Sequence, residues 1–223
     1  LLKGGDKKSL SLLIDLLGGL SIKELNFLKI KSEKNVELKI NLELLEYFWN
    51  RHLNSSIPIQ YLGGISYWRD LKLEVSNKVL IPRPETELMI EIIIEKFKNK
   101  NEKITFADLG TGSGAIGIAL ALLNPKWNGL ATDIDKNAIE IASRNFTKNS
   151  NQSNLKFYLG NWWNPLENFK GEIDLAVANP PYIPQETYMD LPKEVKNFEP
   201  GIALLGGKDG LEHIKAVSYT HLR

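Results

Sequence analysis

The chain has 223 residues, 43% of them hydrophobic, and its 28 basic and 27 acidic residues leave a net charge of +1. This length gives room for one full domain and a small one, each with a buried core. The balanced charge argues against direct binding to nucleic acid, because such enzymes hold phosphates through a basic face. Cysteine is absent, which excludes disulfides and thiol catalysis, and the three histidines lack the spacing of a metal site, so no metal is expected.

The first part of the chain, residues 1–60, predicts a small helical domain. Apolar stripes indicate helices near 9–17, 22–29 and 41–53. The third helix carries an apolar face with Leu42, Leu45, Phe48, Trp49 and His52. Asp15 interrupts the apolar run after the first lysines, so that segment is predicted as a helix rather than a signal peptide. No run reaches the roughly twenty apolar residues of a membrane span, and no membrane association is expected.

Residues 61–80 predict a β-hairpin that links this domain to the rest of the chain. Apolar and polar side chains alternate through residues 71–75, as they do in a half-buried strand. The remaining residues, 81–223, are predicted to form the larger domain.

A glycine-rich loop follows a predicted buried strand at 104–107 and precedes a predicted helix at 115–123. The loop reads Asp108-Leu109-Gly110-Thr111-Gly112-Ser113-Gly114. Its glycines let the backbone approach a bound nucleoside, and the start of the helix offers free N–H groups. A second predicted strand, 129–132, ends in Asp133, where a carboxylate can bind both ribose hydroxyls. Sites for NAD and for S-adenosylmethionine share these features.

Asp108 favours S-adenosylmethionine as the ligand. An acidic residue two positions before the first glycine suits a cationic amino-acid group and would repel the pyrophosphate of NAD. The alternatives are a capping or turn role for Asp108 and an oxidoreductase that binds NAD. Asp135 competes with Asp133 for the ribose, but its place in the turn predicts that it caps the helix at 136–148.

Asn179-Pro180-Pro181-Tyr182 follows a predicted buried strand at 173–178. An amide or aromatic amine nitrogen attacks poorly, because its lone pair is delocalised, so it must be held and polarised. The Asn179 side-chain carbonyl and the Pro180 backbone carbonyl can each accept one N–H and aim the nitrogen at a methyl donor. Tyr182 can cover the planar group by stacking. The alternative is a proline-rich turn that only closes the strand.

Five segments together resemble the peptide chain release factor glutamine methyltransferases, the HemK/PrmC family. They are residues 58–64, 80–87, 108–114, 179–182 and 199–204, and the similarity runs over almost the whole chain. The resemblance implies an α/β fold with a doubly wound, Rossmann-like class I methyltransferase sheet behind a small N-terminal helical domain. It also implies an S-adenosylmethionine-dependent enzyme that methylates the glutamine of the Gly-Gly-Gln motif in class I release factors, in support of translation termination.

The same resemblance assigns the site residues. The donor site comprises Gly110, Thr111, Gly112, Ser113, Gly114, Asp133, Trp162 and Asn179. Asn179, Pro180, Pro181 and Tyr182 form the substrate site, with catalysis by Asn179, Pro180 and Tyr182. Trp162 is expected beside the adenine; Trp163 competes for that role, and a core aromatic is the other alternative. Asn161 stands where the family often has an acidic residue. Arg83 and Glu85 are either residues of the pocket lip or parts of a salt bridge between domains.

Both ends of the sequence depart from the family pattern. The chain begins without methionine, the family continues through a helix and three further strands, and residues 217–223 do not resemble it. We therefore expect a sheet without its C-terminal strands and an apolar edge at 174–178. A monomer in the cytoplasm with a release factor as its partner is expected. The alternatives are an adenine-amine methyltransferase acting on DNA or RNA, and a donor-binding fragment without turnover.

Overall fold

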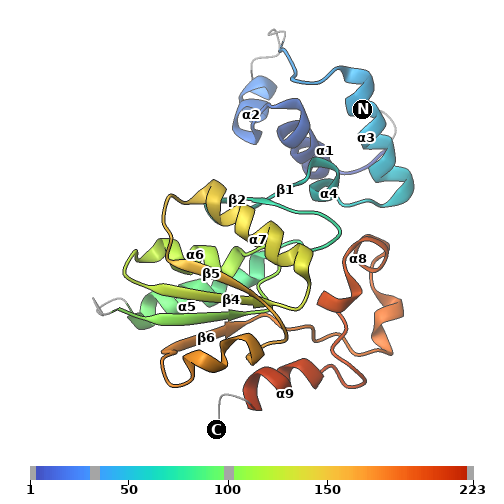
Figure 1. Cartoon of the computed structure of the whole chain (residues 1–223). Coiled ribbons are helices and arrows are strands. Elements are labelled where there is room, and N and C mark those ends of the chain that lie inside the picture. Colours follow the sequence, from blue (N-terminus) through green and yellow to red (C-terminus); the bar gives the residue numbers. More distant parts are fainter. Residues whose placement is uncertain (1–3, 31–35, 98–102, 220–223) are drawn as a thin grey trace. The chain divides into compact units, whose positions relative to one another are not determined.

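The computed structural model describes residues 4–30, 36–97 and 103–219 (Figure 1). The chain divides into two compact units after Ile65. Of the stretch 217–223, residues 217–219 continue the last helix, and residues 220–223 lie outside the described residues. Within the described ranges, no helix combines the length and the apolar character needed to cross a membrane.

The first unit is helical, as the sequence predicts. Its helices are α1 (Lys7–Leu13), which continues as a π-helix over Ile14–Gly18, α2 (Ile22–Ile30), α3 (Leu42–Ser55) and α4 (Ile59–Gly63). The helices predicted near 9–17, 22–29 and 41–53 are thus confirmed. Leu13, Leu45, Trp49 and Ile59 form the core of this unit. Leu42 is 70% exposed, so its predicted place on the apolar face is wrong. It is the first residue of α3, and the buried face begins one turn later.

Side-chain caps fix where these helices begin. The Asp6 carboxylate accepts the backbone N–H groups of Lys8 and Ser9 ahead of α1. Asn41 accepts the Leu44 N–H at 2.8 Å ahead of α3. Each cap satisfies backbone donors that have no partner within the helix, which is why the helices begin after these residues.

The second unit contains a two-stranded sheet and a four-stranded parallel sheet. The small sheet, with β1 (Ile65–Trp68) and β2 (Leu71–Glu74), lies within the predicted hairpin segment 61–80, but residues 61–63 belong to α4 instead. The large sheet has the order β5-β4-β3-β6, with β3 (Thr105–Leu109), β4 (Asn128–Asp133), β5 (Leu155–Leu159) and β6 (Leu175–Ala178). The helices are α5 (Glu87–Phe97), α6 (Ala115–Leu123), α7 (Lys136–Asn149), α8 (Lys193–Phe198) and α9 (Glu212–Tyr219). Short 3-10 helices are η2 (Pro84–Thr86), η3 (Asn164–Phe169), η4 (Thr187–Asp190) and η5 (Gly201–Ala203).

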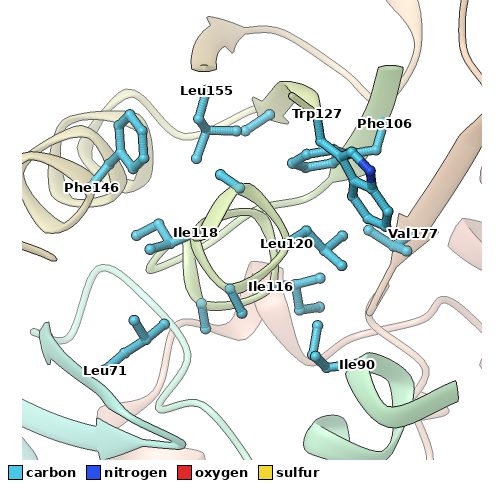
Figure 2. Close-up of a cluster of buried hydrophobic side chains, with 14 of the residues drawn as sticks. Leu71, Ile90, Phe106, Ile116, Ile118, Leu120, Trp127, Phe146, Leu155 and Val177 are labelled. Carbon is cyan, nitrogen blue, oxygen red and sulfur yellow. The ribbon is translucent and has the colours of Figure 1, made fainter. Parts of the chain in front are cut away.

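The side chains of β3 alternate between two layers of the core. Phe106 belongs to the cluster around α6, which is apolar on all sides and therefore buried; Figure 2 shows α6 surrounded by this cluster. Ala107 and Leu109 belong to a second cluster, which includes Leu166 of η3 and Val217 of α9. Both faces of the sheet are covered, as in a doubly wound α/β fold.

The register of the sheet brings three loops to one edge. Leu109 at the end of β3 pairs with Thr132 of β4 and with Ala178 of β6. Since the strands are parallel, the loops after β3, β4 and β6 all leave from the carboxyl edge, where such sheets bind their ligands. Within the described residues β6 pairs with β3 alone, so it forms one border of the sheet, where an apolar edge was expected.

Asn145 of α7 ties the hairpin to the glycine loop. The side chain is fully buried. Its Oδ1 accepts the Glu74 N–H at 2.6 Å, and its Nδ2 donates to the carbonyls of Glu74 at 3.0 Å and of Ser113 at 2.8 Å. Beside it, hydrogen bonds from Arg144 and then Lys148 lower the pKa of Glu74 to about 2. One amide thus sets the position of the loop that carries Ser113 relative to β2.

We expect Asn145→Ala to lower the free energy of unfolding by about 2–4 kcal/mol, because it leaves three backbone groups unpaired in the interior. Urea denaturation followed by circular dichroism measures this change. The matched control is Asn151→Ala, which removes an exposed amide and should stay within about 0.5 kcal/mol of the unsubstituted chain. Equal stability of the two variants would contradict the proposed tie.

Candidate active site

A cavity of about 330 Å³ lies at the carboxyl edge of the large sheet, and all of its lining residues belong to the second unit. Several parts of the chain contribute to it. They are Trp68 of β1, the segment between β2 and α5, the loops after β3 and β4 with the first turns of α6 and α7, the turn after β5, the loop after β6, the start of η5, and α9. Its size lies within the range of small-molecule and cofactor sites.

The glycine loop contributes to this site, and its glycines differ in the space that lies where a side chain would be. The N–H groups of Gly110 and Thr111 both donate to the Thr132 carbonyl, at 2.9 and 2.8 Å. A Cβ added to Gly110, whose φ is +74°, would lie 2.9 Å from the Trp162 ring. A Cβ added to Gly112, whose φ is +56°, would meet no atom within 4 Å. Gly110 therefore makes room for an aromatic ring, and Gly112 has open space on its side-chain side.

Of the predicted loop residues, Gly110, Thr111 and Ser113 line the cavity, whereas Gly112 and Gly114 do not. Gly114 instead begins α6 and packs against α7: a Cβ there would lie 3.2 Å from the Ala142 Cα. The predicted donor contacts of Gly112 and Gly114 remain predictions.

Asp133 lines the cavity at the end of β4. Its Oδ2 accepts the Gly112 N–H at 2.8 Å, and its Oδ1 accepts the Asp135 N–H at 2.9 Å. Burial raises the pKa of this carboxyl. Each oxygen keeps a further lone pair, so the carboxylate can still accept two hydroxyl donors. Asp135 caps α7 by accepting the Asn137 N–H at 2.8 Å, which confirms its predicted role.

Asp108 is fully buried and does not line the cavity. Its Oδ2 accepts the Thr111 hydroxyl at 2.6 Å and the Gly117 N–H at 2.9 Å. A Cβ on Gly117 would lie 2.9 Å from this oxygen, so a glycine is needed there. Oδ1 is buried and has no hydrogen-bond partner in the part of the chain that the structure describes. Burial raises the pKa of Asp108 to about 6. The geometry favours the turn role, and contact with the donor stays a prediction.

The structure distinguishes the two neighbouring tryptophans. Trp162 lines the cavity, and the Thr132 hydroxyl donates to its carbonyl at 2.9 Å. Its φ of +45° is unusual for a large side chain. Trp163 is not among the lining residues and donates its indole N–H to the Val217 carbonyl at 2.9 Å, although both tryptophans pack against the second core cluster. Trp162 is therefore the tryptophan available to a ligand, and Asn161 lines the cavity beside it.

Asn179 and Pro181 line the cavity, whereas Pro180 does not and Tyr182 is 61% exposed. The Asn179 Nδ2 lies 3.5 Å from the Thr86 hydroxyl oxygen, a long hydrogen bond. With the amino group turned to Thr86, the side-chain carbonyl of Asn179 is the free end of the amide.

The loop after η5 forms backbone hydrogen bonds with the residue that follows the Asn-Pro-Pro-Tyr segment. The Ile183 N–H donates to the Leu204 carbonyl and the Gly206 N–H donates to the Ile183 carbonyl, both at 2.9 Å. A Cβ on Gly206 would lie 2.8 Å from the Tyr182 Cα, so only glycine permits this approach. The predicted motif at 199–204 therefore leads into the segment that holds residues 182 and 183 in place.

Arg83 both lines the cavity and forms an ion pair. Its Nη2 lies 2.6 Å from Oε1 of Glu199, whose side chain is buried. Burial raises the pKa of Glu199 and Arg83 opposes this effect. Both residues belong to the second unit, so the alternative of a bridge between domains is wrong for this pair. Glu85 lies exposed in η2 and is not among the lining residues.

The lining residues that the sequence analysis does not single out include Thr86, Ile134 and His213. Thr86 lies within the segment 80–87, of which only Arg83 and Glu85 are considered there. Ile134 directly follows Asp133, and an apolar residue in that turn is a usable signal; the structure shows its side chain exposed. His213 has no local signal, because only the path of α9 brings it to the site.

The parallel sheet, the glycine loop and the acidic residue at the end of β4 define a Rossmann-like class I methyltransferase. Residues 86–194 match the methyltransferase small domain. Among solved structures, the hMettl16 catalytic domain in complex with MAT2A 3'UTR hairpin 6 superposes with a TM-score of 0.56 at 16% identity, covering 99% of this chain and 74% of that one. At this identity the likeness concerns the fold alone.

Curated relatives narrow the class to a family. The chain is 42% identical over 216 residues to the release factor glutamine methyltransferase of Prochlorococcus marinus, covering 96% of this chain and 74% of that protein. It is 40% identical to the protein of the same name from Thermosynechococcus vestitus, covering 83% and 64%. The corresponding protein of Lactococcus lactis is 36% identical, with 85% and 67% covered. The chain belongs to the release factor glutamine methyltransferase family and spans about two thirds to three quarters of these relatives' length.

The cofactor of this methyltransferase family is S-adenosylmethionine, and the cavity suits it. The Asp133 carboxylate and the Trp162 ring, which line it, offer acceptors for hydroxyls and an aromatic surface. Outside the lining, Gly112 has open space on its side-chain side, and the buried Oδ1 of Asp108 has no hydrogen-bond partner among the described residues.

We expect Asp108→Asn to raise the melting temperature at pH 8 and to change it little at pH 4. A folded-state pKa of about 6, above the ordinary 3.8, means that the protonated carboxyl stabilises the fold at low pH. This contribution to the free energy of unfolding is lost as the pH rises through about 6. The loss is at most roughly 3 kcal/mol. Asp70→Asn, which changes an exposed acid, is the control.

The same variant tests the donor contact. Unchanged affinity for S-adenosylhomocysteine, measured by titration calorimetry, would leave Asp108 with a turn role only. Weaker binding together with higher stability would identify it as a donor-site carboxylate whose burial costs stability. A melting-temperature shift that is equal at both pH values would contradict the burial argument.

Proposed function

We propose that this chain transfers a methyl group from S-adenosylmethionine to the side-chain amide nitrogen of the glutamine in the Gly-Gly-Gln motif of class I peptide chain release factors. The observation that carries the proposal is that Asn179 and Pro181 line the same cavity as Gly110 and Asp133. Pairing of β3 with β6 joins these groups, because Gly110 and Asn179 each follow the last paired residue of its strand. The donor and acceptor sites therefore share one space.

S-adenosylmethionine, when bound, supplies an electrophilic methyl group on a sulfonium sulfur. Gly110, Thr111 and Ser113 would hold it at the loop, with Asp133 on the ribose. The Asn179 side-chain carbonyl and the Pro180 carbonyl would accept the two N–H groups of the substrate amide, which leaves the nitrogen's remaining lobe free to attack. Such acceptors act where positive charge develops on the nitrogen, so no base is needed before attack. The nitrogen loses its extra proton to water afterwards.

Thr86 has a positioning role in this proposal. An asparagine amide can present either its carbonyl or its amino group to a substrate, and only the carbonyl can accept an N–H. In the structure Nδ2 donates to the Thr86 hydroxyl oxygen at 3.5 Å, and in this orientation Oδ1 is the end of the amide that we propose faces the substrate. Tyr182, which is exposed next to this segment, is available to stack on the substrate amide.

A protein substrate agrees with the composition of the chain, whose net charge is only +1. We assign release-factor recognition to residues 1–60 of the helical unit and a linking role to residues 61–80; exposed apolar side chains of this unit include Phe27, Leu42 and Tyr47. The proposal further holds that the chain acts as a monomer in the cytoplasm and does not bind nucleic acid.

The test is to incubate the chain with labelled S-adenosylmethionine and a purified release factor and to locate the label by peptide mass spectrometry. The Prochlorococcus marinus relative serves as the reference enzyme, and a release factor with the motif glutamine changed to alanine is the negative control. Label on the motif glutamine supports the proposal. Transfer to DNA or RNA instead would overturn it, and donor binding without transfer to any acceptor would identify a donor-binding fragment.

Asn179→Ala should lower turnover by roughly 10²–10³, as loss of one preorganised polar partner does. Affinity for S-adenosylhomocysteine should stay within about threefold, because the proposed loss concerns the acceptor nitrogen. Single-turnover rates and calorimetric titration measure the two quantities separately. Equal losses of rate and affinity would make Asn179 mainly a donor-binding residue.

Thr86→Val should lower kcat roughly five- to tenfold, since it removes one neutral hydrogen bond while keeping the side-chain shape. Thr86→Ser keeps the hydroxyl and should retain most of the rate. Neither variant should alter the Kd of S-adenosylhomocysteine. If valine and serine variants turn over equally, the hydroxyl does not orient Asn179; if the valine variant mainly loses donor affinity, Thr86 contacts the donor instead.

A further inference from the structure

Helix α9 presents one face to the cavity. Glu212, His213 and Ala216 are its lining residues, and their spacing places them along one side of the helix. Ile214 and Lys215 are exposed on the helix and are not among the lining residues. The family resemblance assigns no role to any residue of α9.

The imidazole of His213 contacts the indole of Trp162. The two ring centroids lie 5.6 Å apart with an interplanar angle of 53°, within the range of favourable aromatic pairs. The Trp162 ring also lies against Gly110, because a Cβ on Gly110 would be 2.9 Å from its Cζ3. Trp162 thus contacts both the glycine loop and α9, and the cavity is lined by all three.

Three contacts hold α9 where His213 reaches the cavity. The Trp163 indole N–H donates to the Val217 carbonyl at 2.9 Å, and Val217 packs in the core cluster that includes Leu109. The Glu212 N–H donates to the Gly206 carbonyl at 3.0 Å at the start of the helix. Lys215 pairs with Asp209 at 3.1 Å. The turn that carries Trp162 and Trp163 therefore contacts α9 at both residues, and the position of His213 is fixed.

We propose that His213 is a donor-binding residue, whose imidazole, together with the Trp162 indole, contacts the adenine ring of S-adenosylmethionine. Adenine has flat apolar faces and an edge that carries both hydrogen-bond donors and acceptors. A neutral imidazole is flat and carries one donor and one acceptor. It can therefore stack on a face of adenine or form a hydrogen bond with its edge. Asp133 and Ile134 line the same cavity, which agrees with the ribose and adenine lying near this wall. The inference rests on the proposed donor site and does not depend on the acceptor.

The experiment measures the Kd of S-adenosylhomocysteine for the unsubstituted chain and for His213→Ala, His213→Phe and Ile214→Ala by titration calorimetry. His213→Ala should raise Kd roughly three- to tenfold, as loss of an aromatic contact does. His213→Phe keeps a ring and should lie closer to the unsubstituted chain. Ile214→Ala, the matched control on the same helix, should stay within about twofold. Thermal denaturation of each variant identifies any loss of folding.

A second ligand locates the effect. 5′-Methylthioadenosine contains the adenosine but lacks the amino-acid group. His213→Ala should therefore raise its Kd by the same factor as the Kd of S-adenosylhomocysteine. An unchanged Kd for both ligands in a folded His213→Ala variant would overturn the inference. An effect on S-adenosylhomocysteine alone would overturn it as well, because His213 would then act at the amino-acid end. Should His213→Ala lose folding, His213→Leu, which fills the space without a ring, takes its place: a roughly three- to tenfold rise in Kd for both ligands supports the inference, and an unchanged Kd for both overturns it.

The methyl-transfer assay on the same samples separates this inference from the proposed function. Binding that depends on His213 without transfer to the release factor leaves the inference standing and contradicts the function. Transfer to the release factor by His213 variants that bind both ligands normally supports the function and contradicts the inference. Failure of the unsubstituted chain to bind either ligand would overturn the inference.

Discussion

The turn between β3 and α6 depends on one buried carboxylate. Asp108 lies in the central strand and binds the Thr111 hydroxyl and the Gly117 N–H, so it fixes both sides of the glycine loop at once. The raised pKa shows that burial of this acid is unfavourable. The carboxylate nevertheless accepts two hydrogen bonds there, and Gly117 leaves room for the accepting oxygen. With the loop fixed, the Thr132 carbonyl and the Asp133 carboxylate accept its backbone N–H groups. The loop then lines the cavity.

The proposed donor and acceptor halves of the site have separate supports. The glycine loop is held by Asp108, by Asp133 and, through Ser113, by Asn145. The Asn-Pro-Pro-Tyr segment is held by the loop at 204–206, and the Arg83–Glu199 pair joins that loop's neighbourhood to the segment before α5. The two halves meet directly where β3 pairs with β6. Changes in one half can therefore alter rate or donor affinity largely independently, which is the property that makes the chemistry separable by mutation.

Much of the fold and part of the site could be predicted from the sequence. Strong periodicity, the glycine loop and capping residues identified β3, α6, β4 and α7 closely, because local physics and tertiary packing agree there. The separation of Trp162 from Trp163 could not be predicted, since both are large aromatics and only the positive φ and the contact with Val217 distinguish them. The burial of Asp108 could not be predicted either: its side chain is fully buried and binds the turn, while its predicted contact with the donor stays a prediction. His213 lies far along the chain from Gly110, Asp133 and Trp162, so no local pattern could connect it to them.

The contact of the Trp162–Trp163 turn with α9 has a consequence for the order in which the site forms during synthesis. The wall that contains Trp162 is complete only when Val217 is available to accept the Trp163 indole N–H. A nascent chain emerges from its N-terminus, and domains fold as their last contacts become available. The glycine loop and Asp133 leave the ribosome well before α9, so an early chain has the loop without its aromatic wall fixed. A nucleoside bound as proposed would therefore meet the fixed aromatic side of the cavity only after α9 has been synthesised and has packed against the Trp162–Trp163 turn.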